Sequence, residues 1–417
     1  MYGSEKDVRR NLFLFVADGV VFVPAMTLIS ISTIIPYFLE RLGATALHIA
    51  IAVAMTYICN FISQPFFGSV ASRTHKLHKT NGKILITQRI IFITFLLSIP
   101  LYANSYGVIL WMFLIFWGVF NIFVGSYSVF YTSLLLKLLP PDKRGAIRGM
   151  GYAVGSVLGV GAAALIPKIL GAFSFPYNYV VIFMLGTLIL MIDGILFLFM
   201  REHEETEPRV PLGVLQYLKA MPSTIRKNAA FRAMILTCTC LAIANSLLSY
   251  YTLYAIRVFS ATESHIATLS ALSVITVSVG YVFFGFIIDR RGTKATSLIA
   301  ACLITAAGAI ALTTHMLPLL YVAWVLANLG STCTMMTITL LLGDVCPYEN
   351  LPLNVGVYST ISLACSSIMV LLLAPLLERA GFAVVFTTVF LCGLFSFLIN
   401  VFALRKHLVA KEGAAAP

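Results

Sequence analysis

Four long stretches of the chain contain no charged side chain. Asp, Glu, Lys and Arg are absent from residues 90–136, 295–343, 350–377 and 380–404. The whole chain of 417 residues is 60% apolar and 11% charged, with a mean hydropathy of +0.96. Ordinary soluble domains carry about 25% charged residues, so this composition does not fit a water-soluble fold. Lipid is the simplest solvent for such stretches.

The two longest uncharged stretches must each hold two membrane spans, because a helix crosses the roughly 30 Å bilayer core with about 20 apolar residues. The segments 102–107 and 315–318 supply the turns between those spans. A closed barrel could also cross a bilayer, but the stretches lack the alternation of polar and apolar residues that a barrel lumen imposes. The sequence therefore predicts an all-α membrane protein with twelve transmembrane helices. The expected spans are 11–39, 44–70, 84–103, 108–137, 147–170, 177–200, 230–256, 264–288, 295–314, 318–343, 354–377 and 381–404.

The distribution of Lys and Arg predicts the orientation of these spans. With the N-terminus inside, only Arg41, Lys168, Arg257 and Arg379 of the 28 basic residues fall on the outer side, and the other 24 stay inside. Positively charged loops resist translocation, so we expect a multi-pass protein of the cell membrane with both termini in the cytoplasm. Short cytoplasmic loops beside anionic lipid also account for the net charge of +12, so we expect no nucleic-acid partner.

A polar stretch near the middle divides the chain into two halves. We expect an N-terminal six-helix bundle at 1–200, a cytoplasmic linker at 201–228 and a C-terminal six-helix bundle at 229–417. An internal repeat supports this division, because the Pro, acidic and Gly residues at 140, 142 and 149 recur 207 positions later. The two bundles are therefore predicted to be pseudo-symmetric.

The loop after the eighth expected span carries the most specific motif. It reads GFIIDRRGTK from Gly285 to Lys294, and the loop after the second span reads GSVASRTHK from Gly68, with Ser72 in place of the acidic residue. This motif, in a layout of six spans plus six, resembles the signature loop of the major facilitator superfamily of secondary transporters. The resemblance implies two bundles that rock around a shared substrate cavity, which is alternating access.

The resemblance also implies a cytoplasmic gate. Asp289 is expected to face the N-terminal end of the fifth span in the other bundle, near Arg148, where the helix dipole favours an anion. The alternative is that the charged loop only ends a helix and fixes the topology. The other residues of the expected gate are Gly285, Arg290, Arg291 and Gly292.

A second ion pair is predicted from the repeat. Lys137 corresponds to Asp344 at the same offset of 207, so opposite charges end the fourth and tenth spans on the same side. They would hold the two bundles together there, although exposed pairs contribute at most about 1 kcal/mol.

Three charged residues lie more than one turn inside expected spans, where their cost demands an explanation. Asp18 lies in the first span, Arg89 in the third and Asp193 in the sixth. Burial and a neighbouring cation act in opposite directions on a carboxyl group, which allows protonation to be coupled to conformation. We expect these residues to form the proton-coupling site, with Asp18 as the main candidate. The alternative for the carboxylates is a structural ion pair or hydrogen bond, for Asp18 with Arg89 or a neighbouring backbone group. The alternative for Arg89 is a side chain that reaches the headgroups.

The family resemblance assigns the cavity to the first, fourth, seventh and tenth spans. Tyrosines spaced i, i+4 share one helix face and suit an amphiphilic or aromatic substrate. The alternative for each residue is ordinary helix packing. No charged residue lies in the middle of these spans, which argues against a strongly charged substrate. The expected substrate-binding residues are Thr27, Ser30, Asn121, Tyr127, Tyr131, Asn245, Tyr250, Tyr254, Asn328 and Thr332.

Secondary active transport of a small molecule, coupled to protons and exporting an amphiphilic compound, is the expected function. The glycine-rich fifth span resembles that of family antiporters, although Ser156 follows Gly155 where they have proline. The alternatives are a proton-coupled uptake symporter for a small polar solute and a non-transporting receptor or scaffold. The chain has no phosphate-binding glycine loop, zinc-type HExxH or nucleophile elbow, so we expect no enzyme and no cofactor. We expect a monomer.

Overall fold

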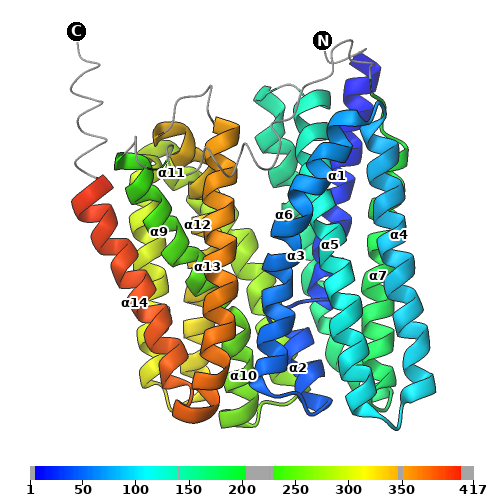
Figure 1. The fold of residues 1–417 in the computed structure, drawn as a ribbon, viewed down its shortest axis with the longest axis vertical. Helices are drawn as coiled ribbons and strands as arrows, with labels where there is room; N and C mark the ends of the chain where they lie inside the picture. Colours follow the sequence, from blue (N-terminus) through cyan, green and yellow to red (C-terminus); the bar gives the residue numbers. More distant parts are fainter. Residues whose placement is uncertain (1–4, 140, 203–224, 226–228, 346–350, 405–417) are drawn as a thin grey trace. The chain divides into compact units, whose positions relative to one another are not determined.

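The computed structural model describes residues 5–139, 141–202, 225, 229–345 and 351–404. All regular elements within these ranges are helices (Figure 1). Within the same ranges, 12 helical stretches are long and apolar enough to cross a membrane. The predicted all-α fold with twelve spans is confirmed.

The helices lie as follows along the chain. The first half contains α1 (Glu5–Leu28), α2 (Ile34–Arg41), α3 (Ala46–Arg73), α4 (Leu77–Ser98), α5 (Tyr106–Leu138), α6 (Pro141–Ala172) and α7 (Tyr177–Leu198). The second half contains α9 (Ala229–Ser246), α10 (Leu248–Phe259), α11 (Glu263–Thr313), α12 (Leu317–Val345), α13 (Leu351–Ala380) and α14 (Ala383–Ile399). A 3-10 turn, Ile99–Tyr102, follows α4, and a π-helical turn, Asn400–Leu404, follows α14.

The contacts within the chain define two compact units. Unit 1 holds residues 1–211 together with 261–275, and unit 2 holds 212–260 together with 276–417. The first part of α11 thus clusters with unit 1, whereas the predicted C-terminal bundle includes all of that helix. Most of the predicted linker lies outside the described residues, so the domain boundaries stay a prediction.

The first expected span is interrupted between α1 and α2. The backbone N–H of Ile35 bonds the Ser30 carbonyl at 2.9 Å, and the hydroxyls of Ser30 and Ser32 lie 3.0 Å apart. Hydroxyl side chains compete with the helical hydrogen-bond ladder, and Pro36 has no N–H to contribute to it. The seventh span is divided in a similar way at Leu247, between α9 and α10.

The long helix α11 contains the eighth and ninth expected spans. They are separated at Gly292, which has φ 75° and ψ 173°. Because L side chains rarely adopt this positive φ, the turn between the two spans requires glycine.

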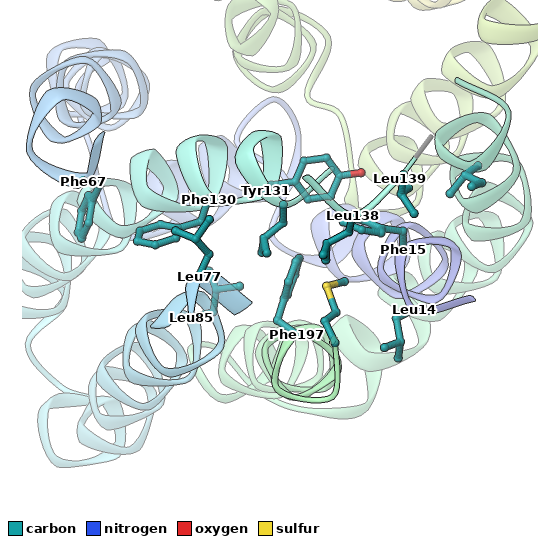
Figure 2. Packing of buried hydrophobic residues seen from close by; sticks show 13 residues of the cluster. Leu14, Phe15, Phe67, Leu77, Leu85, Phe130, Tyr131, Leu138, Leu139 and Phe197 are labelled. Atoms are coloured by element: carbon teal, nitrogen blue, oxygen red, sulfur yellow. The ribbon is translucent and has the colours of Figure 1, made fainter. Parts of the chain in front are cut away.

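Aromatic rings from three helices of unit 1 meet in its core. The ring of Phe15 on α1 lies 5.6 Å from that of Tyr131 on α5 and 6.5 Å from that of Phe197 on α7, both edge to face (Figure 2). Such contacts fix the helices against one another. The residues one turn away on each helix are Asp18, Tyr127 and Asp193, so this aromatic core sets the positions of those polar side chains.

Helices α1 and α6 pack backbone against backbone through glycines. A Cβ added to Gly155 would lie 2.6 Å from the Gly19 carbonyl oxygen, and one added to Gly19 would lie 3.0 Å from Gly151 Cα. Small residues at such crossings let two helices approach closely within a bilayer. The glycines of α6 therefore attach it directly to α1 within unit 1.

In unit 2, α9 packs against α12, α13 and α14. One buried cluster includes Phe231 and Met234 of α9, Leu341 of α12 and Val357 of α13. Tyr251 adds edge-to-face contacts with Trp324 and Phe386. The interior of unit 2 is thus largely apolar where α9 meets its neighbours.

The close α1–α6 contact predicts a large effect of a single methyl group. Gly155→Ala should destabilise the protein by about 1–3 kcal/mol, because the added carbon must push the two backbones apart. Gly161→Ala is the matched control, since its Cβ would meet nothing within 4 Å. Thermal unfolding of the purified protein in detergent checks both variants, and equal midpoints for the two would contradict the packing argument.

Candidate functional site

Arg89 on α4 and Asp193 on α7 form a buried ion pair in unit 1. Arg89 Nη2 lies 2.9 Å from Asp193 Oδ2, and the side chains are 4% and 0% exposed. Arg89 also donates to the side-chain oxygen of Gln88, whose amide in turn donates to the Phe120 carbonyl at 2.7 Å. The guanidinium is therefore held inside the bundle and does not reach toward the headgroups.

Asp18 on α1 joins this pair to α5. The hydroxyl of Tyr127 donates to Asp18 Oδ2 at 3.2 Å, and the Asp18 carboxyl interacts electrostatically with both Asp193 and Arg89. Only 2% of Asp18 is exposed. Four helices, α1, α4, α5 and α7, thus bring the three predicted proton-coupling residues together around one hydroxyl.

The charges of this cluster do not balance when all of its groups are ionised. Two carboxylates face one guanidinium, which leaves an excess of one negative charge in a site whose charged side chains are buried. In the described part of the chain, Asp18 Oδ1, Asp193 Oδ1 and Arg89 Nε are buried without a hydrogen-bond partner. A buried charge that is not compensated costs several kcal/mol. Protonation of one carboxylate would make the cluster neutral.

A partly exposed aromatic surface lies next to the cluster. The rings of Phe22 and Tyr127 stack at 5.9 Å with an interplanar angle of 3°, and Tyr152 of α6 meets Phe22 edge-on at 6.4 Å. The ring of Tyr131 lies 5.2 Å from that of Tyr127 but is buried. We call Phe22, Tyr127 and Tyr152 the aromatic surface of unit 1.

The other predicted substrate residues of unit 1 mostly bond their own backbone. The hydroxyl of Thr27 donates to the Val23 carbonyl at 2.9 Å, and the amide of Asn121 donates to the Trp117 carbonyl at 2.8 Å. Ser30 lies in the break after α1 and bonds Ser32. These contacts favour packing roles, and substrate binding by the three residues stays a prediction.

The predicted substrate residues of unit 2 are also engaged within that unit. Tyr250 is fully buried and donates to the Val370 carbonyl at 3.1 Å, while Tyr254 donates to the Thr314 carbonyl at 3.2 Å. Asn328 and Thr332 bond carbonyls of their own helix α12. Asn245 is partly exposed at the end of α9. Their role in substrate binding stays a prediction.

The predicted gate is described only in part. Gly285 lies inside α11, Gly292 forms the turn, Arg291 is exposed, and the guanidinium of Arg290 lies 4.0 Å from the ring centre of Phe286. The side chains of Arg148, Asp289 and Asp344 lie outside the described residues. The gate and the pairing of Lys137 with Asp344 therefore stay predictions.

Lys137 has a neighbour within unit 1 that the sequence did not suggest. Its amine lies 3.9 Å from Glu202 Oε1, and His78 Nδ1 lies 2.8 Å from Glu202 Oε2. The preceding residue, Arg201, exchanges two hydrogen bonds with the Asn11 side chain and pairs with Asp7. The chain after α7 is thus fixed against α1, α4 and α5.

Sequence reasoning missed Gln88, Phe22 and Tyr152 as parts of the site. Phe22 stands one turn after Asp18 on α1, and Gln88 directly precedes Arg89, so their spacing was a usable signal. Tyr152 had no such signal, because only the packing of α6 on α1 brings it to Phe22.

Comparison with solved structures gives the same fold in transporters. A bacterial homolog of the human lysosomal transporter Spinster, in an inward-facing unoccupied conformation, matches with TM-score 0.60 at 13% identity, covering 98% of each chain. Its inward-facing occupied form matches with TM-score 0.62 at 14% identity, over 98% of this chain and 94% of the other. The human organic anion transporter MFSD10 (TETRAN) matches with TM-score 0.65 at 16% identity, over 94% of this chain and 99% of the other.

Sequence comparison gives a family as well. No curated protein sequence matches the chain. The model of the Major Facilitator Superfamily matches residues 17–261 and 234–416, which together span nearly the whole sequence. With its twelve spans and the fold of its structural neighbours, the chain belongs to the major facilitator superfamily.

Proposed function

We propose that this membrane transporter couples the movement of an amphiphilic small molecule to protons. The observation that carries the proposal is the buried set of two carboxyl groups and one guanidinium, joined through Tyr127 to a partly exposed aromatic surface. We place both termini in the cytoplasm, from the Lys and Arg distribution, and take the transporter to work as a monomer in the cell membrane.

The charge excess of the cluster supports proton coupling. With Asp18 and Asp193 both ionised, Arg89 neutralises only one of them, and the fully buried site retains a negative charge. One proton shared by the two carboxyls makes the cluster neutral. Two interacting carboxyl groups that share a site take up protons as a pair, so the proton belongs to the pair rather than to either residue.

Tyr127 supports a link between that proton and the substrate. Its hydroxyl donates to Asp18, while its ring stacks on Phe22 in the aromatic surface. A hydrogen bond to a carboxylate is roughly twice as strong as one to a neutral group. Protonation of Asp18 therefore loosens the Tyr127 side chain, and with it the surface on which a substrate would stack.

The aromatic surface supports the choice of an amphiphilic substrate. Phe22, Tyr127 and Tyr152 offer ring faces together with two phenolic hydroxyls, which suits a guest with an apolar ring and a polar end. The direction in which protons move relative to the substrate distinguishes the two modes of transport. Export by antiport moves protons opposite to the substrate, and uptake by symport moves them in the same direction. Asp289 and its loop are proposed to hold the cytoplasmic side closed.

Proton movement in proteoliposomes tests the proposal. Liposomes loaded with a pH-sensitive dye receive N-phenylnaphthylamine, an uncharged aromatic amphiphile, or anilinonaphthalene sulfonate, its charged counterpart. We expect one of these probes to drive proton flux with the wild type and none with Asp18→Asn, because the neutral amide leaves Arg89 and Asp193 balanced without a proton. Glu5→Gln is the control, since Glu5 is an exposed acid on the same helix. Proton flux that persists in Asp18→Asn would exclude Asp18 as the coupling group.

The link through Tyr127 gives a separate prediction. Tyr127→Phe keeps the ring on Phe22 but removes a hydrogen bond to a charged group, worth about 1.5–3 kcal/mol. We therefore expect the ratio of probe affinities at pH 8 and pH 5.5 to shrink about tenfold or more, with binding itself retained. Fluorescence titration of the same probes measures this ratio.

Tyr152→Phe is the matched control for that measurement. It also removes a phenolic hydroxyl from the aromatic surface. The hydrogen bond to Asp18 comes from Tyr127, whereas Tyr152 contacts the ring of Phe22. We expect it to keep the pH dependence of the wild type. An unchanged affinity ratio in Tyr127→Phe would show that Tyr127 does not transmit the protonation state.

A further inference from the structure

Two helices of unit 1 begin with the same short motif. Thr45-Ala-Leu-His48 opens α3, and Thr262-Glu-Ser-His265 opens α11, at an offset of 217 residues. In each case the threonine directly precedes the first helical residue and the histidine is the third residue of the helix. These are the positions of a capping box, in which Glu or Gln usually takes the place of the histidine.

The hydrogen bonds of the two motifs are nearly identical. The backbone N–H of Thr45 donates to His48 Nδ1 at 3.2 Å, and that of Thr262 donates to His265 Nδ1 at 3.1 Å. The threonine hydroxyl lies 2.9 Å from the same ring nitrogen in both. In each motif Nδ1 therefore accepts a hydrogen bond from the backbone, which requires a neutral imidazole with its proton on Nε2.

Protonation removes this acceptor. In the imidazolium both ring nitrogens are donors, so the threonine N–H loses its partner at the helix end. The new positive charge also lies beside the positive end of the helix dipole, which is unfavourable. Both imidazoles are partly exposed, so protons from water can reach them.

The groups that face the two imidazoles do not replace the lost bonds. His48 meets the edge of Trp111 of α5, with ring centres 5.3 Å apart. Next to His265, the carboxylate of Glu263 is held by Arg41 of α2 at 3.1 Å, and Tyr37 of α2 interacts electrostatically with both. Glu263 is thus already paired when His265 becomes charged.

The second cap lies where the start of α11 is attached to the rest of unit 1. The Arg41–Glu263 ion pair is one attachment, and the buried hydrogen bond from Ser270 to Thr33, at 2.8 Å, is another. Loss of the cap at Thr262 loosens the turn that carries Glu263. Acid would therefore weaken the attachment of the first part of α11 to the rest of unit 1.

We propose that His48 and His265 form a pair of proton-sensitive helix caps, which keep the first turns of α3 and α11 ordered at neutral pH and release them in acid. Under the proposed orientation both caps face the outside of the cell. The transporter then senses external acidity at these caps, separately from the buried cluster around Asp18.

Hydrogen exchange on the full-length protein in nanodiscs tests the paired caps. The probe is the proton alone, at pH 5.5 and pH 8, with rates corrected for intrinsic exchange. In the wild type, peptides covering 44–50 and 261–268 should lose about fivefold in protection at pH 5.5, the loss expected for one helix cap. The double variant His48→Gln/His265→Gln keeps an acceptor that does not titrate, so its protection should not change with pH.

Two further outcomes decide the matter if glutamine caps poorly. His315→Gln, at an exposed histidine elsewhere in the chain, should show the full pH response of the wild type. Nitrogen NMR of labelled histidine should show Nε2-protonated neutral rings at pH 8, lost in the double variant. Equal protection of the wild type at both pH values, or Nδ1-protonated neutral rings at pH 8, would overturn the proposal.

Discussion

A hydrocarbon environment offers no water to polar groups, and the arrangement of this protein follows from that constraint. Many Ser and Thr hydroxyls in the described helices donate to a carbonyl one turn back on their own helix, as Thr27, Thr187 and Thr334 do. Such residues are satisfied locally and can be placed almost anywhere on a span. A carbonyl of the same helix cannot neutralise a charged side chain, so charged groups must pair with one another across helices.

The pairing of Arg89 with Asp193 is the main consequence. Its residues lie 104 positions apart, and the pair connects α4 to α7 inside unit 1. Asp18 then becomes the additional acid in a site that already has its counter-ion. A structural ion pair and a proton site were alternatives when only the sequence was considered, but the geometry lets one cluster contain both, because two carboxyls share a single guanidinium.

The sequence predicted the fold well because lipid imposes a one-dimensional rule. Runs of apolar residues of sufficient length become spans, and the twelve expected spans match the twelve apolar helical stretches of the structure. The interruption near Ser30 was missed, since hydroxyl residues are equally compatible with a continuous helix. Asp18, Asp193 and Arg89 were identified by their cost in a bilayer. The pairing of Arg89 with Asp193 was not predicted, because side-chain direction depends on the aromatic packing of Phe15, Tyr131 and Phe197.

Other contacts had no signature in the sequence. Lys137 was matched to Asp344 by repeat symmetry, whereas its observed neighbour Glu202 belongs to the chain just after α7. Repeat symmetry compares equivalent positions and does not report a contact that occurs in one half alone. The paired histidine caps show the opposite case, where a four-residue motif recurs with the same hydrogen bonds but at an offset other than 207.

The glycine contact between α1 and α6 has a mechanical consequence. Side chains between two helices act as a soft layer that can absorb small shifts by changing rotamer, and here that layer is absent over the turns around Gly19. We therefore expect α1 and α6 to move together when α1 is displaced near Asp18. Tyr152 of α6 would then keep its contact with Phe22 of α1 during such a displacement.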